Sequence, residues 1–131
     1  MRFFVLSFVL ISSCSNNSEI SNFDPMNLDL IKNDKVNSVA VYTLSYSATA
    51  SACGDIYNSN LLKDRLIKLL SIAKKKKSIT NDGLKILKSP VYYVTKGANL
   101  YKYKSFVSCS EARNYYDGVK KQVDSFIITN S

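Results

Sequence analysis

The chain has 131 residues, with 18 Lys and Arg against 10 Asp and Glu and no His, so its formal net charge is +8. A chain of this length forms one domain at most, which excludes multidomain enzymes. The absence of His removes the commonest general base and the commonest metal ligand. The composition therefore favours a small basic protein without catalytic or metal-binding chemistry.

The N-terminus begins with a single positive charge, Arg2, followed by an apolar run over residues 3–11 that only Ser7 interrupts. This run is shorter than the roughly 20 residues that a membrane-spanning helix needs. Its length and its flanks are typical of the apolar region of a secretory signal. Residues 1–13 are therefore predicted to be a signal peptide and not a transmembrane helix.

The apolar run ends in the tetrapeptide Ile11-Ser12-Ser13-Cys14. A branched apolar residue, two small residues and a cysteine resemble the lipobox of bacterial lipoproteins. The resemblance implies that Cys14 receives acyl chains such as palmitate and becomes the N-terminus of a mature chain anchored in the bacterial cell envelope. Ser15 follows the cysteine, and the same resemblance then implies the outer membrane, with the protein facing the periplasm.

Residues 14–36 are rich in Asn, Ser and Asp and show no sustained hydrophobic period. Such a composition is typical of a flexible linker, so we expect a lipidated tether here and a folded domain over residues 37–131. A few apolar residues of this segment could still dock on the domain. They are Phe23, Leu28, Leu30 and Ile31.

The first predicted helix covers residues 38–53, after the capping candidates Asn37 and Ser38 and before Gly54. Its expected inner stripe consists of Tyr42, Tyr46, Ala50 and Cys53. The second predicted helix covers residues 59–77, where apolar residues recur at helical spacing. They are Leu61, Leu62, Leu66, Leu69, Leu70 and Ala73.

A third helix is predicted to open at Ser89-Pro90 and to run to about residue 104, with Val91, Val94, Ala98 and Tyr101 on one face. Residues 91–107 also fit a β-hairpin, because β-branched and aromatic residues favour strands. The fold is accordingly predicted to be mainly α, with an α+β fold as the alternative.

The last predicted helix begins at the capping box Ser108-Cys109-Ser110-Glu111 and continues to the C-terminus. Its apolar stripe is Ala112, Tyr115, Tyr116, Val119, Val123, Phe126 and Ile127. With this element the domain becomes a small bundle of about four helices.

With Cys14 assigned to lipid, Cys53 and Cys109 are the two cysteines that remain. An exported chain passes through an oxidising compartment, so we predict a disulfide between them. A zinc site is disfavoured because it needs about four ligands and the chain has no His. Closing so long a loop would contribute roughly 4 kcal/mol to stability on the chain-entropy model.

No pattern of catalytic residues stands out. Ser71-Ile72-Ala73-Lys74 matches the short S-x-x-K string of penicillin-interacting serine enzymes, but those enzymes need partner motifs that this chain lacks. The acidic residues are dispersed, and the four glycines form no phosphate-binding loop. We therefore expect neither an enzyme nor a bound cofactor or metal.

The basic residues lie mostly in residues 55–131, and their density is highest at Lys74, Lys75, Lys76 and Lys77. This run could face anionic lipid, another polyanion or an acidic protein, although no specific nucleic-acid recognition is expected. The alternative is a solvated helix end in which the lysines complement the helix dipole. Both interpretations remain open from the sequence.

Two functions from different classes fit this sequence. The first is a lipid-anchored structural or interaction subunit of an envelope assembly, such as a secretion or transport complex, with an envelope protein as partner. The second is a ligand-binding module whose basic surface captures an anionic molecule. Steep weakening with salt would identify the second, because polyanion binding depends on charge.

Overall fold

The computed structural model describes residues 27–104 and 108–130, which form six α-helices. These are α2 (Asp34–Ala52), α3 (Ile56–Lys75), α4 (Asn81–Lys88), α5 (Pro90–Lys104), α6 (Cys109–Arg113) and α7 (Tyr116–Asn130). The described residues contain no β-strand, only an isolated antiparallel bridge between Ile31 and Ile79. The mainly α prediction is confirmed, and the hairpin alternative over residues 91–107 is wrong because α5 occupies most of it.

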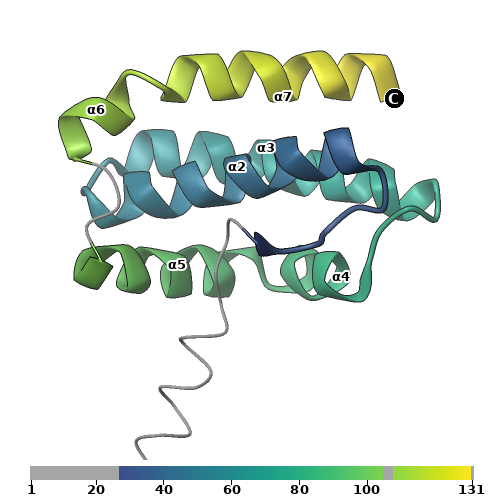
Figure 1. Ribbon diagram of the computed structural model, residues 1–131, viewed down its shortest axis with the longest axis horizontal. Helices are drawn as coiled ribbons and strands as arrows, with labels where there is room; N and C mark the ends of the chain where they lie inside the picture. Colours follow the sequence, from purple (N-terminus) through teal and green to yellow (C-terminus); the bar gives the residue numbers. More distant parts are fainter. Residues whose placement is uncertain (1–26, 105–107, 131) are drawn as a thin grey trace, which may run out of the picture.

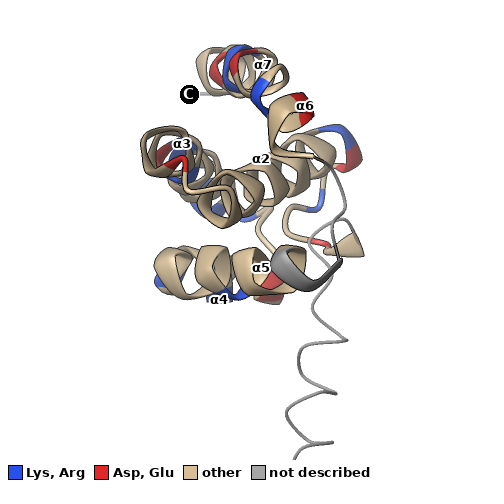
Figure 2. Ribbon diagram, turned by 90° about the vertical axis from the view of Figure 1, so that its left-hand side faces the viewer, with Lys and Arg blue, Asp and Glu red and all other residues tan. Residues whose placement is uncertain are grey.

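The helices lie in three layers (Figure 1). The antiparallel pair α2 and α3 forms the middle layer, with α7 on one side and α4 and α5 on the other. Figure 2 shows the same layers from the end of the bundle. Since α2 contacts α3, α5, α6 and α7, it is the central helix.

Burial of α2 extends around most of its circumference. Its buried residues are Val39, Ala40, Val41, Thr43, Leu44, Ser45, Ser47, Ala48, Thr49 and Ala50. The prediction of a buried inner stripe is wrong at Tyr42, which is 43% exposed. A helix covered on several sides needs small or apolar residues all round rather than one stripe.

The hydroxyl groups inside α2 are satisfied locally. Thr43 donates to the carbonyl of Val39 at 2.6 Å, and Thr49 donates to that of Ser45 at 2.8 Å. Such bonds remove most of the cost of burying a hydroxyl.

A reciprocal pair of serines joins α2 to α3. Ser47 Oγ donates to the carbonyl of Ser59 at 2.8 Å, and Ser59 Oγ donates to the carbonyl of Ser47 at 2.9 Å. Both side chains are buried and small, so the two backbones can approach closely. The predicted leucine stripe of α3 then covers α2, except that Leu61 is only half-buried.

The folded body begins well before residue 37. Leu30 and Ile31 are almost fully buried, and the backbone N–H groups of both donate to Asn37 Oδ1 at 2.7 and 3.0 Å. The side chain of Asn37 therefore holds the segment before α2 against the helix, and it does not cap α2. Asn33 is the cap, because its side chain accepts from the N–H groups of Lys35 and Val36. The C-terminal part of the expected tether, residues 14–36, therefore belongs to the folded body. Phe23, also considered for docking, lies outside the described residues.

Helix α4 was not predicted from the sequence. Thr80 caps it by accepting from the N–H of Gly83 at 3.0 Å. A Cβ at Gly83 would lie 2.2 Å from the backbone oxygen of Leu30. Glycine is therefore needed here so that α4 can approach the N-terminal segment closely.

Helix α5 begins at Pro90 as predicted, and the carbonyl of Ser89 accepts from the N–H of Tyr93 at 3.2 Å. Of its expected inner face, Val94, Ala98 and Tyr101 are buried. Val91, in the first turn of α5, is instead 61% exposed.

The last predicted helix is divided in two. Ser108 caps α6 as expected, accepting from the N–H of Glu111 at 3.2 Å, but the helix ends at Arg113, with Asn114 as its C-cap. Tyr115 is 53% exposed, whereas Tyr116 and Val123 are buried against the middle layer. The break lets α7 start on a new axis with Tyr116 directed into the core.

Helices α2 and α3 end with the same backbone geometry. After α2, Gly54 has a φ of 80°, and after α3, Lys77 has a φ of 56°. At both ends the two N–H groups that follow the cap bond back to the last turn, for example Ser78 to Ala73 at 2.8 Å. This is a Schellman end, in which a left-handed residue is usually glycine. Lys77 therefore carries backbone strain that Gly54 does not.

We expect Lys77→Gly to raise the free energy of unfolding by about 1 kcal/mol, because glycine relieves this strain. Gly54→Ala should lower it by a similar amount, since no atom lies within 4 Å of the added Cβ and only strain changes. Urea denaturation measures both. Lys77→Gln is the control that removes the charge alone, and a gain equal to that of glycine would contradict the strain argument.

Candidate functional site

The antiparallel arrangement gives the bundle two different ends. We call the disulfide end the one where α2 ends and α3 begins, because Cys53 and Cys109 lie there. We call the lysine end the opposite one, where α2 begins and both α3 and α7 end (Figure 1).

The predicted disulfide is confirmed. Cys53 and Cys109 are bonded, with their Cα atoms 5.7 Å apart and 56 positions apart in sequence. The bond joins the C-cap of α2 to the first residue of α6. It therefore holds the outer α6–α7 layer to the middle layer.

A chain of polar contacts lies beside the disulfide. Asp55 caps α3 and accepts from the backbone and side-chain N–H groups of Asn58 at 3.1 and 2.9 Å. Asn58 in turn accepts from Lys120 of α7 at 3.0 Å. The hydrogen bonds from Asn58 lower the pKa of Asp55. Stability from this cap is present above the carboxyl's unfolded pKa and is lost as the pH falls through the folded value.

Tyr116 fills the space under this network. Its residue is only 2% exposed, and its hydroxyl has no hydrogen-bond partner among the described residues. Burial, followed by the charge of Asp55, raises the pKa of Tyr116. The ring packs edge-on to Tyr46, with 6.3 Å between centroids. In this environment the phenol of Tyr116 stays neutral, and the residue contributes mainly its ring to the core.

One bidentate ion pair ties α7 to α3 between the two ends. Arg65 donates from Nε and Nη2 to the carboxylate of Asp124, at 2.8 and 3.1 Å. The pair is only partly buried, so its contribution to stability is modest, but its planar geometry fixes the register of the two helices.

The lysine run occupies the lysine end. Lys74 and Lys75 form the last turn of α3, Lys76 is its C-cap, and Lys77 is the left-handed residue. All four are exposed and make no ion pair with another described residue. Lys32 comes alongside, since its N–H donates to the carbonyl of Ser78 at 2.7 Å.

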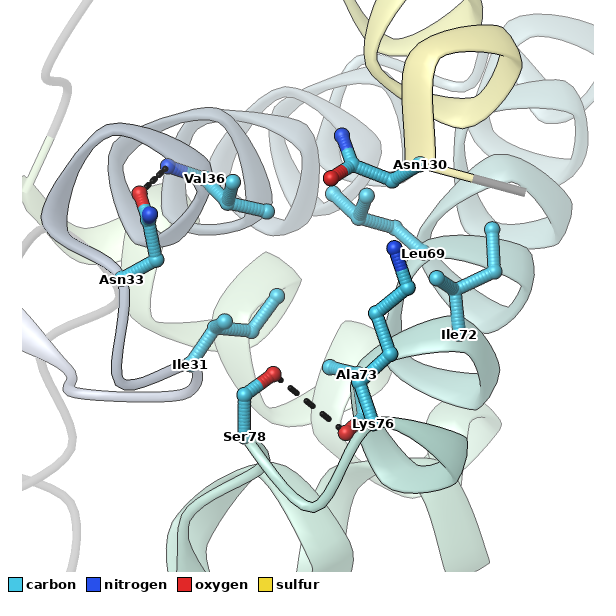
Figure 3. A pocket seen from close by; sticks show the side chains of 9 residues that line it. All are labelled: Ile31, Asn33, Val36, Leu69, Ile72, Ala73, Lys76, Ser78 and Asn130. Atoms are coloured by element: carbon cyan, nitrogen blue, oxygen red, sulfur yellow. Dashed lines mark hydrogen bonds between the residues drawn. The ribbon is translucent and has the colours of Figure 1, made fainter.

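A hollow of about 220 Å³ opens beside the run (Figure 3). Its walls come from the start of α2, the end of α3 and the end of α7. The lining residues are Ile31, Asn33, Val36, Leu69, Ile72, Ala73, Lys76, Ser78 and Asn130.

The hollow has an apolar floor and a polar rim. Asn33 uses its carbonyl oxygen to cap α2, which leaves its amide N–H groups as donors. Asn130 uses its amide to bond the carbonyl of Phe126 at 2.8 Å, which leaves its oxygen as an acceptor. Lys76 extends back toward Asn130 and supplies the only charged side chain of the lining. The site can therefore hold an apolar group next to an anion.

Other candidates from the sequence lie elsewhere or have structural roles. Ser71 donates its hydroxyl to the carbonyl of Ile67 at 2.8 Å, so it acts within its own helix. Cys14 lies outside the described residues. Across the described part of the chain, no three His, Cys, Asp or Glu side chains are placed to hold a metal ion. No helix described is long and apolar enough to cross a membrane.

The hollow was not predicted from the sequence. Its walls come from three segments that are distant in the chain, and no local pattern links them. Two local signals were present: Lys76, which belongs to the predicted lysine run, and the capping residue Asn33, which marks the true start of α2.

Comparisons with known proteins identified no similar protein. No protein-family model matches the chain, and neither curated proteins nor solved structures match it.

Replacing Cys53 or Cys109 with serine should lower the free energy of unfolding by roughly 2 to 5 kcal/mol, because the open chain gains conformational entropy. Chemical denaturation under oxidising conditions measures the loss. The double variant Cys53→Ser/Cys109→Ser is the control for effects of an unpaired thiol. Alkylation of the denatured, unreduced wild-type protein should label neither cysteine, and labelling of both would contradict the bond.

Proposed function

We propose that this chain is a bacterial envelope lipoprotein, anchored by acyl chains on Cys14, and that its helical body acts as a structural or interaction subunit of an envelope assembly. The observation that carries the anchor is the short apolar run ending in Ile11-Ser12-Ser13-Cys14. The proposed location is the outer membrane, with the body facing the periplasm.

The short distance in sequence between Cys14 and the described helical body supports this proposal. Residues 14–26 precede the first described residue, Asn27. A segment of about 13 residues spans at most about 45 Å when fully extended. The body would thus stay within that distance of the membrane surface, where envelope proteins can reach it.

The surface of the body supports an interaction role. Several large apolar side chains are exposed among the described residues, and most of them are tyrosines: Tyr42, Ile56, Tyr57, Val91, Tyr92, Tyr115 and Ile128. Tyr57 is 72% exposed, more than any other tyrosine whose side chain the structure describes. Tyrosine is enriched at protein interfaces because it combines a large apolar ring with a hydroxyl.

The internal cross-link fits an exported protein. A disulfide such as Cys53–Cys109 persists in the periplasm but is rare in the reducing cytosol. The bond also stabilises a body whose core is of modest size.

Cys14→Ser should abolish attachment to the membrane, because it removes the cysteine of the lipobox that would receive the acyl chains. Fractionation of cells and labelling with a palmitate analogue measure attachment and acylation separately. Cys53→Ser is the matched control and should remain acylated. A Cys14→Ser protein that stays membrane-bound with its signal peptide removed would contradict the anchor.

Changing Lys74, Lys75, Lys76 and Lys77 together to Gln should leave co-purified envelope proteins unchanged, because an apolar interface does not depend on these charges. In-cell crosslinking of wild type and variant, followed by purification at low and high salt, provides the measurement. The free energy of unfolding, obtained from thermal melting, should change by no more than about 1 kcal/mol. Loss of the partners at high salt and in the variant would favour the anionic-ligand function instead.

A further inference from the structure

We propose that the hollow at the lysine end is a binding site for a medium-chain carboxylate. The alkyl chain would occupy the apolar floor, and the carboxylate would pair with Lys76. This inference goes beyond the interaction role and does not rest on the lipid anchor, because every lining residue belongs to the folded body.

The floor selects an alkyl chain. Ile31, which precedes α2, and Val36 from the first turn of α2 line the hollow together with residues from the end of α3. These are Leu69, Ile72 and Ala73. None of these five side chains offers a hydrogen bond, so a polar group placed among them would lose its water without compensation.

The size of the hollow limits the length of that chain. An apolar cavity of about 150 Å³ is known to hold a six-carbon ring, so a hollow of about 220 Å³ has room for a ligand slightly larger than that. The matching ligand is therefore a linear chain of about six to eight carbons.

The rim selects a single negative charge. Lys76 has no ion-pair partner among the described residues and extends toward Asn130 (Figure 3). The amide of Asn33 supplies further donors on the opposite side of the hollow. Both arginines of the body lie outside this lining, so the bidentate fork that favours phosphate is missing. The carboxylate of Asp34 does not line the hollow.

The lysine run explains how an anion would reach this rim. Lys74, Lys75 and Lys77 surround Lys76 in sequence and are exposed. Together they attract anions to the lysine end over a distance of about 10 Å at moderate salt. Only Lys76 lines the hollow, so it alone should determine how tightly the bound carboxylate is held.

Binding is tested with the mature chain, residues 14–131, carrying Cys14→Ser so that no acyl chain of its own competes. Calorimetric titrations with butanoate, hexanoate, octanoate and decanoate measure the effect of length. We expect affinity to rise roughly fourfold for each added methylene and then to level off near eight carbons. Affinity that does not change with length would overturn the proposal.

The charge is tested by comparing octanoate with octan-1-ol. Wild type should prefer octanoate by about fivefold, as expected for a partly exposed ion pair. Lys76→Gln should lose this preference while octan-1-ol binding stays the same. Lys74→Gln is the matched control, from the same helix end but outside the hollow, and should keep the preference.

A third variant tests the location. Val36→Phe should fill the hollow and weaken binding of octanoate and octan-1-ol alike by at least tenfold, with circular dichroism verifying that the helices remain. Unchanged octanoate binding in Lys76→Gln, or in a folded Val36→Phe protein, would overturn the assignment. Tighter binding of octyl phosphate than of octanoate would overturn the carboxylate as the ligand class.

Discussion

The enclosure of α2 is the constraint on which the whole structure depends. Because α3, α5, α6 and α7 all contact it, no side of this helix can carry a large charged residue toward the core. Its sequence meets this demand with Ala, Ser and Thr, whose small side chains let the neighbouring helices come close. The buried hydroxyls find carbonyl partners, as in the pair Ser47 and Ser59, so close packing does not leave polar groups unsatisfied.

Local sequence patterns were sufficient to predict a helix and its buried face where the helix packs mainly against one neighbouring layer. The leucines of α3, the proline that opens α5 and the Ser108 cap could all be predicted, because each depends on spacing or on a backbone preference within a few residues. The pairing of Cys53 with Cys109 followed from elimination and compartment. For α2, a single stripe was the wrong expectation, since the number of covering layers is not encoded locally.

The start of the body illustrates a second limit. Asn33 and Asn37 are both good capping residues, one helical turn apart, and propensity does not distinguish them. The burial of Leu30 and Ile31 decides the matter, because it places Asn37 beside their N–H groups. The candidate site shows the same limit. Its lysines are visible in the sequence, whereas the hollow exists only once three helix ends have met.

The central position of α2 also affects how the protein can mature. This helix is the first described helix to be synthesised, yet α7, one of the helices that cover it, is the last. Half-built chains therefore cannot bury α2, and the native bundle waits until the whole chain has been made. A chain that folds so late keeps the apolar surface of α2 exposed until its synthesis is almost complete. The Cys53–Cys109 bond likewise joins positions 56 residues apart, so it too requires most of the chain to have been made.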